Sequence, residues 1–176
     1  MKTDKDFNIK FTGLKLGYHK FDFQLDKSFF DLFEFSDFED ANLKVDLIME
    51  KKTNSLELDL TLSGTVLVPC DVTNDLFDLP LENKISLLVK FGEEFNDENE
   101  EILILPFDSH YVDISQVAYE LAVLTVPLKK INPDVLSGKK GGDILKKIED
   151  LSPDVQSETK EGEVDPRWDK LRTLLN

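Results

Sequence analysis

Few residues of this chain could act as nucleophiles or metal ligands. The chain has one cysteine, Cys70, and two histidines, His19 and His110. Together these three would match the ligand count of a catalytic zinc site, and Cys70 with His110 would match a Cys/His nucleophilic pair. Neither set has the spacing or flanking motif of such a site, and a zinc knuckle would need a second thiolate where Thr73 stands. A cysteine at the end of a strand is the simpler interpretation, so the sequence predicts no catalytic residue, no metal site and no cofactor.

Acidic residues and one glycine-rich stretch are the other candidates for chemistry. Carboxylates are abundant, but most fall on the polar faces of predicted strands or in loops, whereas a glycosidase-like pair needs one acid in an apolar environment. Residues 138–142 (GKKGG) lack the spacing of a phosphate-binding loop and do not follow a predicted strand. We interpret them as a flexible basic linker. Two alternatives stay open: the lysine-rich segment 129–147 contacts RNA directly, or clustered carboxylates serve a metal-dependent hydrolase.

The C-terminal end of the chain has an amphipathic pattern. Asp165 and Pro166 predict the start of a helix, because aspartate is a favoured N-cap and proline a favoured first helical residue. Apolar residues then recur on one face of that helix. This face either packs on the protein's own domain or lies in a hydrophobic groove of a partner. The candidate partner-binding residues are therefore Asp165, Pro166, Arg167, Trp168, Leu171 and Leu175.

Net charge and hydropathy limit the classes of partner. The 176 residues carry a formal net charge of -15, from 21 Lys+Arg against 36 Asp+Glu. This charge repels phosphate backbones and favours encounter with a basic protein, although acidity can also serve solubility alone. No stretch approaches the roughly 20 apolar residues of a membrane span, and the N-terminal residues lack the apolar segment of a secretory signal. We expect a cytoplasmic protein that does not associate with membranes.

Alternating apolar and polar residues predict a β-rich first part. Strands are expected at residues 7–16, 18–25, 43–48, 56–68, 76–81, 84–91 and 102–105. The clearest signal is the hairpin of 43–48 with 56–68, which Pro69 ends because proline cannot donate to a sheet. Residues 27–35 are expected to form a short helical turn or loop. The acidic stretch 93–101 is expected to be a mobile loop.

The hydrophobic period changes to that of a helix at Asp113. Asp113 with Gln116 resembles a capping box, and apolar residues follow at helical spacing until Pro127. Beyond it we expect a short helix at 144–151 that Asp143 caps. The sequence thus predicts an α+β fold, mainly an antiparallel β sheet in a barrel or sandwich-like arrangement, with one packed helix and a helical C-terminal tail. The predicted division is a β-rich domain with one helix at 1–128 and a flexible charged tail with short helices at 129–176.

Three segments, in this order, resemble a known family. They are the run from Gly64 to Asp71, the helix that Asp113 opens and Pro127 ends, and the terminal DPRW motif at 165–168 with Leu171 and Leu175 after it. The combination resembles the YceD family, the large ribosomal RNA subunit accumulation proteins, over most of the chain. Many members carry Cys-x-x-Cys after the Gly-x-Val strand. This sequence keeps only Cys70 of that motif, so no metal is carried over.

The resemblance implies a bacterial, cytoplasmic factor that large-subunit ribosomal RNA needs in order to accumulate, in a family for which no enzymatic activity is established. Combined with the acidic charge, it predicts a non-enzymatic accessory factor in large ribosomal subunit biogenesis. Its expected partner is a ribosomal protein or a large-subunit assembly intermediate, with ribosomal RNA contacted indirectly. Direct binding of ribosomal RNA and metal-dependent hydrolysis are the alternatives.

The C-terminal pattern leads to a test. If the terminal helix face binds a partner, Trp168→Ala combined with Leu171→Ala removes its largest apolar side chains and weakens partner capture in a pull-down. The β-rich domain should stay folded, which circular dichroism checks. Unchanged capture by the double variant would contradict a partner-binding role for this face.

Overall fold

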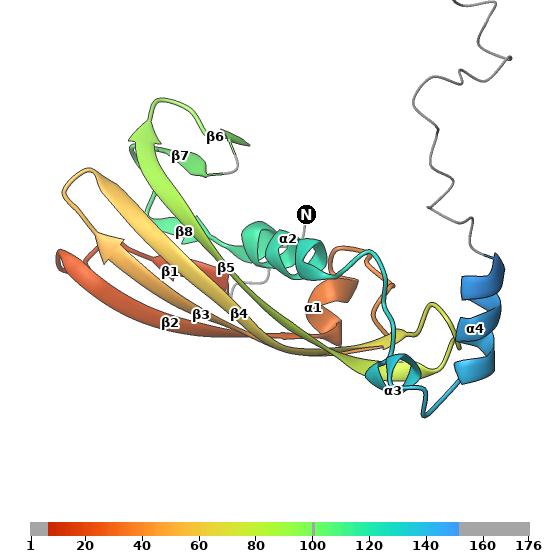
Figure 1. Ribbon diagram of the computed structural model, residues 1–176. Helices are drawn as coiled ribbons and strands as arrows, with labels where there is room; N and C mark the ends of the chain where they lie inside the picture. The colour runs from red at the N-terminus through yellow and green to blue at the C-terminus, as the bar shows by residue number, and fades with distance from the viewer. Residues whose placement is uncertain (1–6, 100, 152–176) are drawn as a thin grey trace, which may run out of the picture.

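The computed structural model describes residues 7–99 and 101–151, which form a six-stranded sheet, a two-stranded ribbon and four helices (Figure 1). The strands are β1 (Asn8–Lys10), β2 (Gly17–Asp26), β3 (Asp40–Lys51), β4 (Ser55–Pro69), β5 (Leu76–Gly92), β6 (Asn96–Asn99), β7 (Ile102–Pro106) and β8 (Tyr111–Asp113). The helices are α1 (Lys27–Asp31), α2 (Ser115–Thr125), α3 (Pro133–Leu136) and α4 (Gly142–Leu151). The sheet order is β2-β3-β4-β5-β7-β6, and β1 pairs with β8.

The three long strands β3, β4 and β5 form the centre of the sheet. Their apolar side chains alternate with polar ones, and the register places them together: Leu47 of β3 lies opposite Leu60 of β4, which lies opposite Ile85 of β5. Neighbouring strands are antiparallel throughout except β5 and β7, which run parallel. A slip of one residue in the pairing would move the inward leucine side chains to the solvent-exposed face. The alternation of apolar and polar residues therefore fixes the register.

One face of this sheet is covered. Helices α1 and α2 and the β1–β8 ribbon lie over it, whereas no described element covers the opposite face (Figure 1). Phe29 and Phe30 of α1 are buried, and the ring of Phe33 stacks on Tyr119 of α2 at a centroid distance of 4.4 Å. Many of the chain's phenylalanines therefore form the layer between the helices and the sheet.

The predicted fold class is confirmed, since the structure is α+β with a mainly antiparallel sheet. The barrel form of that prediction is wrong: β2 and β6 are the two edges of the sheet and do not pair with each other. The helices and the β1–β8 ribbon already bury the apolar face, so closure is not required to remove it from water. The predicted packed helix is α2, and α1 and α3 also bury side chains on the domain.

Several predicted strands change length in the structure. The predicted strands 76–81 and 84–91 are one continuous strand, β5, which passes through Pro80. The predicted strand 7–16 shrinks to β1, because Gly13 takes a positive φ of 93° and turns the chain. The acidic stretch expected to be a loop contains β6, which pairs with β7.

The helix predictions hold with differences at two caps. The helix at 144–151 is confirmed as α4, but it begins at Gly142, so Asp143 lies in its first turn and is not its cap. At α2, the Asp113 carboxylate accepts a hydrogen bond from the N–H of Ser115 at 2.9 Å, but the N-cap position is Ile114, whose side chain caps nothing. The helix thus begins later than a capping box at Asp113 would place it.

Gly64 provides a sharp test of the sheet packing. Its φ is 139°, and a Cβ there would lie 2.2 Å from the carbonyl oxygen of Asn42 on β3. We expect Gly64→Ala to lower the free energy of unfolding by about 3 kcal/mol, because the side chain adds a backbone clash to a strained φ. Equilibrium unfolding in urea measures the change.

Gly13→Ala is the matched control. Gly13 also has a positive φ, but a Cβ there meets nothing within 4 Å. Only conformational strain remains, with an expected loss of about 1 kcal/mol. Equal losses in the two variants would contradict the close approach of β3 and β4 at Gly64.

Candidate protein-binding surfaces

The C-terminal residues predicted to bind a partner lie outside the described residues. They are Asp165, Pro166, Arg167, Trp168, Leu171 and Leu175. The described part of the chain offers three other surfaces: the uncovered face of the sheet, a groove at one end of β4 and β5, and a pocket beside β2.

The uncovered face, called the outer face here, carries the side chains of β2 to β5 that alternate with the buried ones. Carboxylates outnumber lysines on it, so its potential is negative. The carboxylates are Asp22, Asp26, Asp40, Asp46, Glu50, Glu57, Asp59, Asp78 and Glu82. The lysines are Lys20, Lys44, Lys84 and Lys90.

Some of the charges on the outer face are paired within it. Lys44 contacts Asp46 at 2.6 Å, and this hydrogen bond raises the pKa of Lys44, with slight desolvation opposing it and the charge of Asp22 adding to it. Within the described part of the chain, Asp78 and Glu82 form no ion pair. Exposed pairs of this kind contribute little to stability. The excess carboxylates are therefore available to an outside cation.

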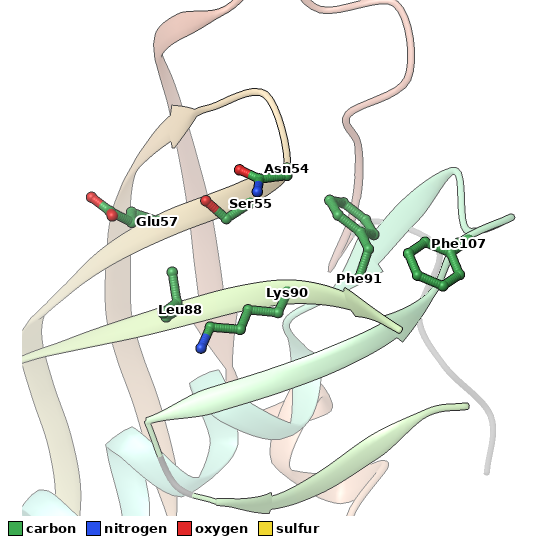
Figure 2. Close-up of a pocket in the computed structure, with 7 residues that line it drawn as sticks. All are labelled: Asn54, Ser55, Glu57, Leu88, Lys90, Phe91 and Phe107. Carbon is green, nitrogen blue, oxygen red and sulfur yellow. The ribbon is translucent and has the colours of Figure 1, made fainter. Parts of the chain in front are cut away.

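A groove of about 480 Å³ opens where β4 begins and β5 ends (Figure 2). Apolar side chains and charged ones both line it, and Phe107, just after β7, is 72% exposed. The lining residues are Asn54, Ser55, Glu57, Leu88, Lys90, Phe91 and Phe107. The exposed ring of Phe107, with Leu88 and Phe91 beside it, lets this groove contact an apolar side chain of a partner.

The structure does not assemble the predicted zinc or nucleophile candidates into a site. His19 lies on β2, where its ring Nε2 contacts the carbonyl oxygen of Lys15 at 2.8 Å. His110 lies just before β8, and Cys70 follows β4. Among the described residues no group of three or more His, Cys, Asp or Glu side chains is placed to hold a metal ion.

Cys70 has a structural setting. Its thiol is buried and accepts a hydrogen bond from the N–H of Asn132 at 3.4 Å. Burial raises the pKa of this thiol, but hydrogen bonds from Asn132, Thr73 and Val72 outweigh burial and leave the pKa below its ordinary value. Cys70 thus helps to hold the segment before α3 against the end of the sheet.

The lysine-rich segment 129–147 also contacts the sheet domain. The N–H of Lys130 donates to the carboxylate of Asp71 at 2.6 Å, and Val135 of α3 is fully buried. Lys139 pairs with Asp134 at 3.7 Å. The stretch interpreted as a linker forms the turn between α3 and α4, with positive φ at Gly138 and Gly141. The charge of Lys139 is therefore engaged within the domain, whereas the contact of Lys130 is made by its backbone N–H and not by its charge.

A second pocket, of about 400 Å³, lies beside β2. Its lining residues are Phe7, Asp22, Phe23, Gln24, Asp26, Ser28 and Phe29. The ring of Phe7 stacks on Phe23 at 5.4 Å and contacts Phe29 at 4.7 Å. Sequence reasoning did not single out this site, because the alternation of Phe23 and its neighbours predicts a buried face and does not show which strand lies at an edge. The order of the strands places the pocket at an edge.

A family model described as "Large ribosomal RNA subunit accumulation protein YceD" matches residues 58–175 of the chain. The chain belongs to the YceD family. The match confirms the resemblance found in the sequence, and the family's description implies a role in the accumulation of large-subunit ribosomal RNA. No curated protein and no solved structure matches the chain. None of the described helices is long and apolar enough to span a membrane.

Asp26, which lines the β2 pocket, also caps helix α1, and the stability that this cap provides should depend on pH. Its carboxylate accepts hydrogen bonds from the Ser28 hydroxyl and from the Phe29 N–H, and these lower its pKa below 3.8 against slight desolvation. A lowered pKa stabilises the fold above the unfolded pKa, and this contribution is lost as pH falls through the folded pKa. We expect Asp26→Ala to cost about 1 kcal/mol at neutral pH, measured in urea, because α1 loses its N-cap.

The pH series supplies the control for that variant. The cost of Asp26→Ala should begin to shrink as pH falls below the unfolded pKa of the carboxyl, about 3.9, and should be smallest once the folded carboxyl is protonated as well. Asp31→Ala removes a carboxylate from the same helix. Among the described residues Asp31 pairs with Lys27 alone, at a partly exposed position, so this variant should have little effect at any pH. A cost at Asp26 that stays constant down to about pH 2 would contradict capping by the ionised carboxylate.

Proposed function

We propose that this protein is a non-enzymatic accessory factor in large ribosomal subunit biogenesis, which supports ribosomal RNA accumulation by binding a basic ribosomal protein or a pre-ribosomal particle. Membership of the YceD family supports the ribosomal role. The observation that carries the binding mode is the uncovered, acidic outer face of the sheet. In this proposal the factor acts in the cytoplasm and without a cofactor.

The physical chemistry of ribosome assembly favours a basic protein as the partner. Proteins that bind RNA neutralise phosphates with lysine and arginine, so a large-subunit protein awaiting assembly presents cationic surface. An acidic face can cover that surface and keep it from non-specific RNA. Binding of this kind requires many carboxylates on one open face, which β2 to β5 supply.

Direct binding of ribosomal RNA is the less supported form of the role. The net charge of -15 repels phosphate. Lys139 of the basic segment already pairs with Asp134. In the proposed role RNA is therefore contacted through its proteins, and the C-terminal residues from Asp165 to Leu175 add a second, apolar contact with the partner.

Depletion of the protein tests the ribosomal role. We expect the level of large-subunit ribosomal RNA to fall relative to small-subunit RNA, because an unassembled RNA is degraded when its assembly proteins are missing. Quantification of both RNAs from the same cells measures the ratio. An unchanged ratio would contradict the role.

A tagged pull-down at moderate salt, with sedimentation of the same lysate through sucrose, tests the binding mode. Large-subunit proteins should be enriched and should stay bound after nuclease treatment. Enrichment that nuclease abolishes, together with steeply salt-dependent binding to ribosomal RNA fragments, would favour direct RNA binding instead.

A further inference from the structure

The free edge of β2 is the feature of the fold that most resembles an unfilled binding site. β2 has ten residues, and in the described part of the chain no strand pairs with its outer side. Its register with β3 runs from Gly17 to Asp26 without a bulge, and it contains no proline. An edge strand of this length presents a row of N–H and C=O groups that can pair with another chain, and bulges or prolines are the usual means of preventing it.

The opposite edge of the sheet, β6, is shorter than β2 and pairs less regularly. β6 has only four residues, and its pairing with β7 has an irregular register. Two of its residues, Asp97 and Glu98, are exposed acids. Short and irregular edges resist the addition of a strand, and β2, although it also carries exposed charges, is neither short nor irregular. Among the described strands, β2 is therefore the edge suited to pairing.

The pocket beside β2 determines which side chains of an added strand this edge favours. Phe7, Phe23 and Phe29 form an aromatic floor, with Phe7 in contact with both other rings. Asp22 and Asp26 bring two carboxylates to the same pocket. A lysine or arginine of an added strand can meet these carboxylates on the outer face, whereas the residues that alternate with it lie on the side of the Phe23 ring.

We propose that the free edge of β2 adds an extended, lysine- or arginine-bearing segment of a protein partner as a further strand, with basic side chains at the pocket formed by Asp22, Asp26 and Phe7. This inference deepens the proposed function and rests on it, because it gives the basic partner a place and a mode of binding. Asp22 and Asp26 are four residues apart on one face of β2, so every second residue of an added strand can meet this face. Main-chain hydrogen bonds supply affinity and the pocket supplies selectivity.

A second copy of this chain is a poorer occupant of the edge. Pairing two β2 strands about a two-fold axis gathers the carboxylates of Asp22 and Asp26 from both copies along one short ribbon. Like charges across strands destabilise a pairing, and Asp22 already lies opposite Asp46 of β3. Each copy also carries a net charge of -15, so self-association meets repulsion that a cationic segment does not.

Binding of a model strand to the full-length protein tests the proposal. The probe is a fluorescein-labelled peptide of alternating valine and arginine, about eight residues long, and the control peptide has glutamate in place of arginine. We expect the arginine peptide alone to bind, by fluorescence anisotropy. In hydrogen exchange, amides of β2 should gain protection on binding while amides of β5 do not change.

Two charge-matched variants separate the pocket from the general charge of the protein. Asp22→Asn with Asp26→Asn removes both pocket carboxylates, and asparagine retains the cap of α1. Asp97→Asn with Glu98→Gln removes two exposed carboxylates from β6, at the opposite edge of the sheet. The first variant should weaken peptide binding by about tenfold, whereas the second should change it by less than about twofold.

Three results would overturn the inference: equal weakening in both variants, no new protection in β2, or a dimer in sedimentation with β2 amides protected at the interface. The ribosomal role is judged separately, by depletion. A fall in large-subunit RNA on depletion, without peptide binding at β2, would reject the β2 site and retain the proposed function. Peptide binding without any effect of depletion would reject the proposed function and retain the site.

Discussion

The burial of one face of the β3–β4–β5 sheet is the constraint on which the rest of the structure depends. Apolar residues, most often leucine or valine, occupy nearly all the inward positions of these strands, and the inward side chains of β3 and β4 are nearly all inaccessible to water. A second layer must cover them, and the phenylalanines of α1 and the helix α2 supply it. Because that layer is helical and lies on one side only, the sheet stays open, with an outer face and two edges exposed to solvent.

Local pattern predicts the central elements well and their surroundings poorly. Strict alternation in β2, β3 and β4 identified these strands, and helical spacing identified α2. The continuity of β5 through Pro80 was not predictable from proline's local preference, because it depends on which neighbour pairs there. The three-residue strands β1 and β8 are about a hundred residues apart in sequence, and only tertiary contacts bring them together. The same limit applies to the β2 pocket, since alternation does not reveal strand order.

The charge of the open sheet and the order of its strands both support the proposal that it binds a basic protein. The family match assigns the chain to the YceD family, and its description concerns large-subunit ribosomal RNA. The outer face adds a surface with excess carboxylates, and the edge at β2 adds unpaired backbone groups beside an aromatic floor. The groove beside Phe107 adds apolar side chains at another end of the sheet. In the proposed function, these features hold a basic chain.

The most direct measurement is site-specific photo-crosslinking in cells from position 18. Tyr18 lies at the start of β2 on the outer face, is 72% exposed, and can be replaced by a photoreactive phenylalanine analogue of similar shape. The account predicts that the crosslinked product is a lysine- and arginine-rich protein of the large ribosomal subunit. Crosslinks to ribosomal RNA alone, or only to a second copy of this chain, would contradict it.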